Sequence, residues 1–242
     1  MSKLITILTG QRAGSNLCQE IIKSCGINVL GEFFVFKEGG GFRDKKCKEK
    51  DDPIKYLKKR IEKDNKDLNV LRVMDGHFNP YGRNEKFKKV LSIVEYSDYV
   101  IILNRNSLLD QYASFLFANQ NDIWIKYQES SLLSKVVNHG FKKIEKKPTF
   151  NSEAFERYKK NMEKSQYLYK TAVRGARNLN VINYEGILNN NLNIDYIIPE
   201  EWRLGLKVDK DYKIPLKISK NIPVWEKFTN PEDVKNYISW DY

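Results

Sequence analysis

The N-terminal stretch, residues 4–25, constrains the fold more than any other part of the chain. Residues 4–9 form an apolar run rich in β-branched side chains, which breaks at Gly10, and apolar positions return at helix-like spacing from Leu17 to Cys25. This change of period predicts a strand, a short turn and a helix. A buried strand that leads directly into a helix is typical of α/β folds with a parallel sheet.

The loop between the predicted strand and helix, residues 11–16, is suited to bind an anion. Gly14 lets backbone N–H groups approach a ligand closely, and the following helix directs its partial positive end at the same place. Ser15 and Asn16 add side-chain donors, and Arg12 adds a permanent cation. The two glycines are too close for a Walker A motif and no lysine follows them, so an ordinary P-loop NTPase is not expected.

The composition allows one sizeable domain, and we expect residues 1–242 to form it. Hydrophobic residues make up 41% of the chain and charged residues 30%, which is enough apolar material for a core. The formal net charge of +11 favours an anionic partner, which could be nucleic acid, an acidic membrane or an anionic small molecule.

The cysteines indicate a reducing compartment. Their number is odd, they contain no C-x-x-C pair, and Cys18 and Cys25 lie too far apart on one predicted helix to form a disulfide. The opening apolar run is too short for a signal peptide, and no stretch reaches transmembrane length. We therefore expect a soluble, cytoplasmic protein without stable membrane insertion.

Three more apolar runs predict buried strands or extended segments, and each is followed by a residue suited to chemistry. Residues 26–30 lead to Glu32, residues 69–74 lead to His77, and residues 98–103 lead to Arg105. Because open α/β sheets bind ligands at the carboxyl ends of their strands, we expect these side chains near a ligand. Apolar neighbours such as Phe33 and Phe34 would raise the pKa of the Glu32 carboxyl, as suits a general base.

Helix signals lie between and after these strands. A helix is predicted after Asp52-Pro53, another after the capping box Ser107-x-x-Asp110, and a long one from Asn151 or Ser152 to about Arg177. Residues 179–183 then predict a late strand, and Asn230-Pro231 begins a last amphipathic helix. The whole pattern predicts an α/β fold with a parallel β-sheet flanked by helices.

The first loop resembles the phosphate-binding loop of sulfotransferases that use PAPS (3′-phosphoadenosine 5′-phosphosulfate). Gln11-Arg12-Ala13-Gly14-Ser15-Asn16 follows that family's order of a basic residue, a small residue, glycine and two Ser/Thr-like residues, with Asn16 as the departure. The strand, Arg105 and the helix that carries Ser114 are similar to the family's second signature. There the resemblance implies that the Arg and the Ser bind the 3′-phosphate.

Two later stretches continue the resemblance. Tyr184-Glu185 after the late strand is similar to the family's third mark, in which the Tyr lies at the adenosine. Lys217, Ser219 and Lys220 are similar to a tail that closes over the 3′-phosphate and leads through a tryptophan to the final helix. The resemblance covers most of the chain apart from segments 38–68 and 119–150.

The resemblance implies two alternative catalytic bases. Glu32 matches the glutamate base of bacterial glycolipid-type sulfotransferases, whereas His77 matches the histidine base of the cytosolic and heparan-type branch. In that branch a lysine stands two residues before the histidine, and here Asp75 occupies its place. We rate the two bases nearly equal and lean slightly to Glu32.

The resulting hypothesis is a sulfotransferase that moves the sulfuryl group of PAPS to a hydroxyl, releases PAP and requires no metal. The basic excess and the aromatic and lysine residues between Trp124 and Lys147 favour a saccharide or glycolipid acceptor. A peptide tyrosine or a small alcohol is the alternative acceptor. Two other classes stay open. A nucleotide kinase-like protein should carry a Walker lysine and an acidic Mg²⁺ ligand, and neither appears in place. A nucleic-acid-binding module would explain the charge, but the chain carries none of the familiar signatures, and we expect no nucleic acid partner.

Overall fold

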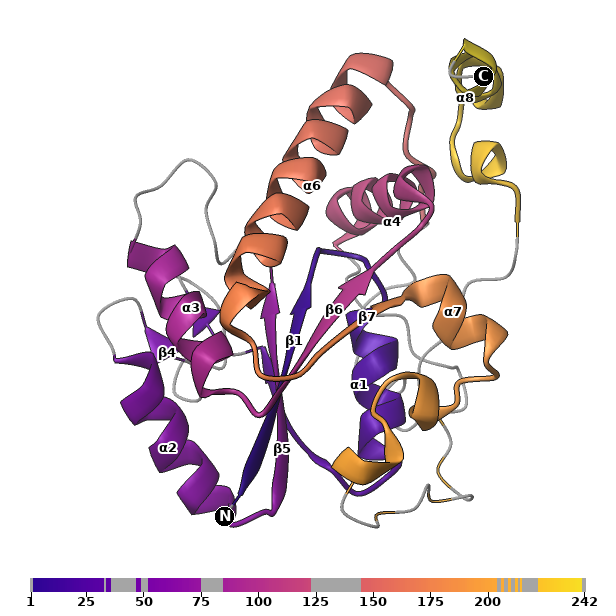
Figure 1. Cartoon of the computed structure of the whole chain (residues 1–242). Coiled ribbons are helices and arrows are strands. Elements are labelled where there is room, and N and C mark those ends of the chain that lie inside the picture. Colours follow the sequence, from indigo (N-terminus) through magenta and orange to yellow (C-terminus); the bar gives the residue numbers. More distant parts are fainter. Residues whose placement is uncertain are drawn as a thin grey trace. The chain divides into compact units, whose positions relative to one another are not determined.

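The computed structural model confirms an α/β fold built on a five-stranded, all-parallel sheet. The structure describes residues 2–32, 34–35, 47–48, 52–74, 85–122, 145–203, 206, 209, 212, 214 and 222–240. The strands of the sheet are β1 (Lys3–Thr9), β2 (Asn28–Glu32), β5 (Leu68–Met74), β6 (Tyr99–Asn104) and β7 (Leu179–Asn183). They lie in the order β2-β5-β1-β6-β7 (Figure 1). The short strands β3 (Phe34–Val35) and β4 (Cys47–Lys48) pair with each other separately.

Strand β1 is the centre of the sheet, and the chain departs from it in two directions. The segment after β1 runs to the edge strand β2 and returns through β5, whereas β6 and β7 extend the sheet on the other side of β1. The loop after β1 therefore lies at the point where the strand order reverses. In open α/β sheets this switch point is where ligands bind.

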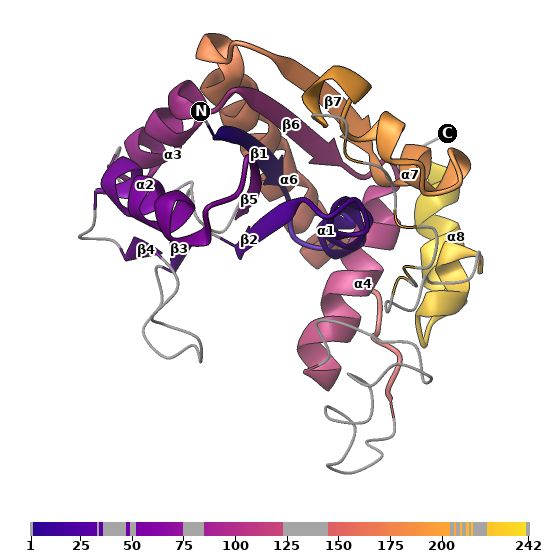
Figure 2. The same cartoon turned by 90° about the horizontal axis from the view of Figure 1, so that it is seen from below.

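Helices cover both faces of the sheet. The helix α1 (Ser15–Lys23) lies on one side, and α2 (Pro53–Asp64) and α3 (Glu85–Tyr96) lie on the other (Figure 2). On the second face Leu4 and Leu8 of β1 pack in one core cluster with Leu57, Ile93 and Tyr169. The alternate residues of β1 must face α1, because successive side chains of a strand point to opposite faces.

The predicted helix starts are confirmed by their caps. Asp52 Oδ1 accepts from the backbone N–H groups of Ile54 and Lys55 at 2.9 and 3.0 Å. These two bonds lower the pKa of the Asp52 carboxyl. The Ser107 hydroxyl likewise accepts from the backbone N–H of Asp110 at the start of α4 (Leu108–Asn121).

The long helix α6 (Ser152–Ala172) begins after Asn151, whose side chain accepts from the N–H of Ala154. It ends earlier than the sequence predicts. The turn Val173–Gly175 (η3) is a tighter 3₁₀ helix instead of a continuation to residue 177.

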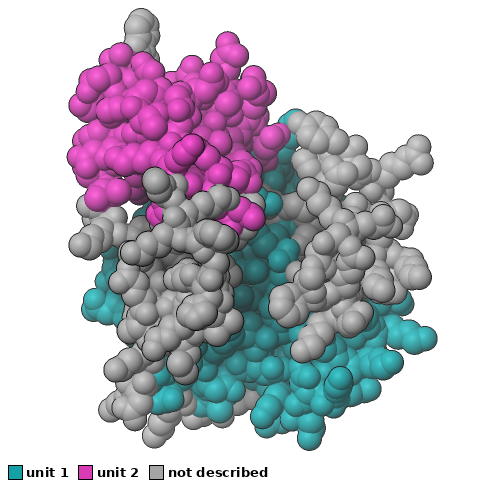
Figure 3. Space-filling view, turned by 180° about the vertical axis from the view of Figure 1, so that it is seen from behind, with its two compact units in different colours: residues 1–106, 162–212 teal, residues 107–161, 213–242 magenta. Residues whose placement is uncertain are grey.

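The chain separates into two compact units, which are coloured in Figure 3. Unit 1 consists of residues 1–106 and 162–212, and unit 2 consists of residues 107–161 and 213–242. Unit 1 holds the whole parallel sheet. The prediction of a single domain over residues 1–242 stays a prediction, because part of the chain lies outside the described residues.

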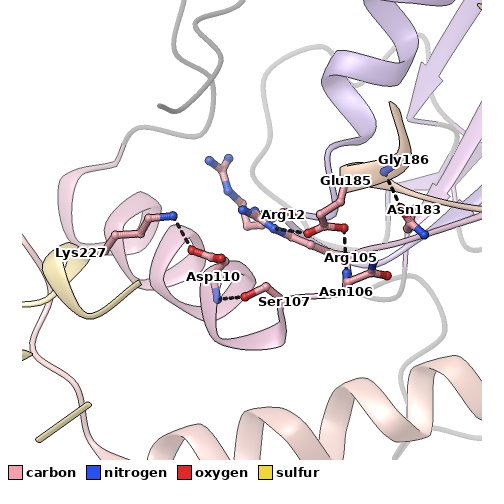
Figure 4. Close-up of polar contacts among 9 residues, drawn as sticks. All are labelled: Arg12, Arg105, Asn106, Ser107, Asp110, Asn183, Glu185, Gly186 and Lys227. Atoms are coloured by element: carbon pink, nitrogen blue, oxygen red, sulfur yellow. Dashed lines mark hydrogen bonds and ion pairs between the residues drawn. The ribbon is translucent and has the colours of Figure 1, made fainter. Parts of the chain in front are cut away.

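Unit 2 is held together by aromatic rings. Tyr112 of α4 packs on Phe155 and Tyr158 of α6, and Phe150 packs edge-on against Phe228 and Tyr237. The remaining elements of this unit are the 3₁₀ turn η6 (Val224–Lys227) and the final helix α8 (Pro231–Trp240), whose predicted start is confirmed. An ion pair between Lys227 and Asp110 links η6 to α4 (Figure 4).

The two cysteines of α1 and its C-terminal turn form no disulfide with each other, as the sequence predicts. Cys18 and Cys25 are both buried and free of any disulfide. Burial raises the pKa of the Cys18 thiol to about 12, so it is an inert thiol in the core. Among the described helices, none has the length and apolar character needed to cross a membrane.

Candidate functional site

The loop after β1 leads into α1 without a side-chain cap at the start of the helix. Arg12 and Gly14 adopt left-handed backbone conformations, with φ of 62° and 89°. Gly14 is the N-cap of α1, and within the described chain no side chain caps this helix and no acidic residue lies in its first turn. The first backbone N–H groups of a helix have no intrahelical partner, and an N-terminus of this kind can bind an anion such as phosphate.

The C-terminal end of β1 is held by a hydrogen bond from a residue of α6. The Tyr169 hydroxyl donates to the backbone oxygen of Thr9 at 2.6 Å, and both residues are buried. This bond fixes the strand end from which the loop departs. The sequence analysis missed Tyr169, because nothing marks one tyrosine in a long amphipathic helix as the partner of a strand end.

Arg105 reaches the loop from the end of β6, as its position predicts. Its Nη1 donates to the backbone oxygen of Arg12 at 3.2 Å, and its side chain is only 12% exposed. Glu185 lies beside it, with Oε1 at 3.8 Å from Arg105 Nε and Oε2 accepting from the backbone N–H of Asn106 at 2.9 Å (Figure 4). The described structure thus brings two of the predicted arginines together at one loop.

Tyr184 also lies at this loop. It begins the short helix α7 (Tyr184–Asn189), which Asn183 caps by accepting from the N–H of Gly186 at 2.5 Å (Figure 4). The Arg105 guanidinium lies 4.8 Å from the centre of the Tyr184 ring. A Cβ atom at Gly14 would lie 2.2 Å from Tyr184 Cδ2, so the close approach of this ring requires glycine at position 14.

Arg72 reaches the other side of the loop from β5, and the sequence analysis missed it. Its Nη1 donates to Ser15 Oγ at 2.9 Å and to Asn16 Oδ1 at 2.6 Å. Burial lowers the pKa of this arginine, and the nearby carboxylate of Glu32 opposes the shift. The available signal was a charged residue inside an otherwise apolar strand, since arginine is rarely buried without a partner.

Glu32 faces Arg72 because of a bulge in β2. The register between β2 and β5 shifts between Val29 and Gly31, and Gly31 has a positive φ of 75°. The shift pairs Glu32 with Arg72 in register, and Glu32 Oε2 lies 3.8 Å from Arg72 Nη2. Without the extra residue Glu32 would lie level with Val73 and point to the other face of the sheet.

The described partner of Glu32 is a cation, whereas the sequence analysis expects an apolar setting. Phe33 and the side chain of Phe34 lie outside the described part of the chain, so the expectation of a raised pKa stays a prediction.

The remaining predicted site residues divide into two groups. Ala13 is buried and Gln11 half-buried within the loop, and Ser114 lies half-buried on α4 in unit 2. The second group lies outside the described residues and consists of Asp75, His77, Lys217, Ser219 and Lys220.

No group of three or more His, Cys, Asp or Glu side chains within the described ranges could hold a metal ion. The requirement for no metal stays a prediction. Comparison with known proteins adds no assignment: no protein-family model matches this chain, and no curated protein matches its sequence.

Proposed function

We propose that this protein is a sulfotransferase that binds PAPS at the loop after β1 and transfers its sulfuryl group to a hydroxyl acceptor. The observation that carries the proposal is the convergence of two largely buried arginines on this loop. Arg72 approaches from β5 and Arg105 from the end of β6, the two strands that flank β1. Their charges meet the open N-terminus of α1 at the switch point of the sheet, and this supports an anionic ligand.

Both arginines retain capacity for a ligand. Each has a carboxylate at 3.8 Å, which is longer than a direct hydrogen bond, and each has a buried Nε atom with no hydrogen-bond partner among the described residues. A nucleotide with separate 3′- and 5′-phosphates would engage both sides of the loop.

The proposed roles are those that the resemblance implies. The loop with Arg12, Ser15 and Asn16 would hold the 5′-phosphosulfate. Arg105 would bind the 3′-phosphate together with Ser114, Lys217, Ser219 and Lys220, and Tyr184 would contact the adenosine. Gln11 and Ala13 complete the loop backbone.

The chemistry is an in-line displacement. The acceptor oxygen attacks the sulfur atom, the bond between sulfur and the 5′-phosphate oxygen breaks, and PAP leaves with the electron pair. Glu32 or His77 takes the proton of the acceptor hydroxyl, and Arg12 neutralises the charge that develops on the leaving phosphate. Positioning of the reactants and the cationic side chains would stabilise the charge that develops in the transition state, so the reaction as proposed requires no metal.

The acceptor is proposed to be a saccharide or glycolipid hydroxyl. The support is the net charge of +11, which favours anionic acceptors, together with the aromatic and lysine residues of the 119–150 segment. Most of that segment lies outside the described residues.

Labelled PAPS offered with a panel of glycans, glycolipids, peptides and phenols tests this function. We expect label on saccharide hydroxyls. Transfer only to peptide tyrosine or only to small phenols would contradict the acceptor, and no transfer together with ATP turnover would favour a kinase.

A further inference from the structure

Arg72 imposes a direction on every hydrogen bond that it makes with the loop. A guanidinium has only N–H donors and no acceptor. Ser15 Oγ and Asn16 Oδ1, which lie 2.9 and 2.6 Å from Arg72 Nη1, must therefore act as acceptors toward it. The same reasoning fixes the Asn16 amide with its oxygen, rather than its nitrogen, toward Arg72.

This direction decides what the two side chains can offer to a ligand. The oxygen of each accepts from Arg72, so the hydroxyl proton of Ser15 and the NH₂ group of Asn16 remain for donation elsewhere. Both residues lie in the first turn of α1, where the open backbone N–H groups are also donors. The start of α1 thus presents donors of two kinds, as an oxyanion requires.

Arg72 is itself held in place by the sheet. It is a residue of β5, its side chain is 11% exposed, and its second Nη atom faces Glu32 through the bulge at Gly31. A planar guanidinium group that has partners on both sides can orient two side chains at once, whereas a lysine ammonium is a single flexible point charge.

We propose that Arg72 is a positioning residue that orients Ser15 and Asn16 as hydrogen-bond donors to the bound phosphosulfate, an inference that rests on the proposed function. An asparagine has one acceptor for Arg72 and a separate donor for the ligand, so it can serve both.

A double-mutant cycle on PAP binding tests the proposal. Arg72→Met removes the guanidinium group with little change of volume, and we expect PAP affinity to fall about 10- to 100-fold, as for the loss of charge-assisted hydrogen bonds. In a Ser15→Ala/Asn16→Ala background the same Arg72→Met change should lower affinity less than about threefold, because its partners are already gone. Arg72→Lys keeps the charge and should restore only a small part of the loss.

The matched control is Arg203→Met. Arg203 is another buried arginine of unit 1, pairs with Asp195 and lies near Cys25, beyond the C-terminal end of α1. Its loss should leave PAP affinity unchanged, and circular dichroism of each variant checks the fold.

Equal losses from Arg72→Met in both backgrounds, or no loss in the wild-type background, would overturn the proposal. If the wild-type protein binds no PAP, the proposed function fails, and the same cycle is measured with inorganic pyrophosphate. A non-additive loss there would support the role of Arg72 for an anion site of another function. Absence of binding for both PAP and pyrophosphate would overturn both proposals.

Discussion

The loop after β1 is flanked by two arginine–glutamate pairs, and the two arginines make different contacts with it. On each side an arginine about one-tenth exposed has a carboxylate at 3.8 Å: Glu32 beside Arg72, and Glu185 beside Arg105. Arg72 bonds the side chains of the loop, whereas Arg105 bonds its backbone at Arg12 and lies over the Tyr184 ring. Arg72 thus sets the orientation of the donors, and Arg105 sets the path of the chain.

The two carboxylates also differ. Glu185 accepts from the backbone N–H of Asn106 at 2.9 Å, so its position is fixed to the strand end that carries Arg105. Glu32 is the last residue of β2, and the side chains of Glu32 and Glu185 are equally exposed, at 31% each. Under the proposed function, Glu185 would hold the strand end that carries Arg105, and Glu32 would remain one of the two candidate bases.

The largest effect is expected from the catalytic base on the Arg72 side. Glu32→Gln should lower kcat by about 10²–10⁴ with little change in PAP affinity, because a base touches the acceptor rather than the nucleotide. His77→Ala should retain more turnover. If His77 is the base, the ranking reverses and the ascending limb of the pH profile lies near the imidazole pKa of about 6.5. Near-normal turnover in both variants would exclude both residues.

On the other side, Arg105→Ala should weaken PAP binding by about 2 kcal/mol or more, since it removes charge-assisted hydrogen bonds to a phosphate. Titration calorimetry measures the change. Arg203→Ala is the matched control, because Arg203 is equally buried but pairs with Asp195. Unchanged affinity in Arg105→Ala would remove Arg105 from the nucleotide site.

Gly14→Ala should destabilise the fold by about 1–3 kcal/mol, because the new methyl group overlaps the Tyr184 ring and the position needs a left-handed backbone. Urea unfolding measures the loss. Gly175→Ala is the control, since its Cβ would meet nothing closer than 3.8 Å. A stable Gly14→Ala variant would show that the Tyr184 ring does not pack on the loop.

The smallest effect is expected at the bulge. Gly31→Ala and Gly26→Ala should each cost about 1 kcal/mol of stability, because both glycines have a positive φ and open space around the Cβ position. Only Gly31→Ala should also lower sulfuryl transfer, since the bulge aims Glu32 at Arg72. Equal activity in the two variants would mean that the bulge does not position the base.

Much of the fold could be predicted from the sequence, because apolar runs bounded by glycines and capping residues mark all five strands of the main sheet and most of the longer helices locally. The helices α3 and α7 and the short strands β3 and β4 were not predicted. The placement of Arg105 at the loop followed from the rule that parallel strand ends share an edge, whereas Tyr184 was expected there only from the resemblance. The Arg72 network could not be predicted in this way. It depends on the register between β2 and β5, and a one-residue bulge decides which face Glu32 occupies.

The most direct test of the account is titration calorimetry of the wild-type protein with PAP in the presence of EDTA. We expect one PAP to bind per chain without metal, at an affinity that ATP does not match and that falls as salt screens the arginines. Absence of PAP binding, or equal binding of PAP and ATP only when Mg²⁺ is present, would contradict a PAPS site at this loop.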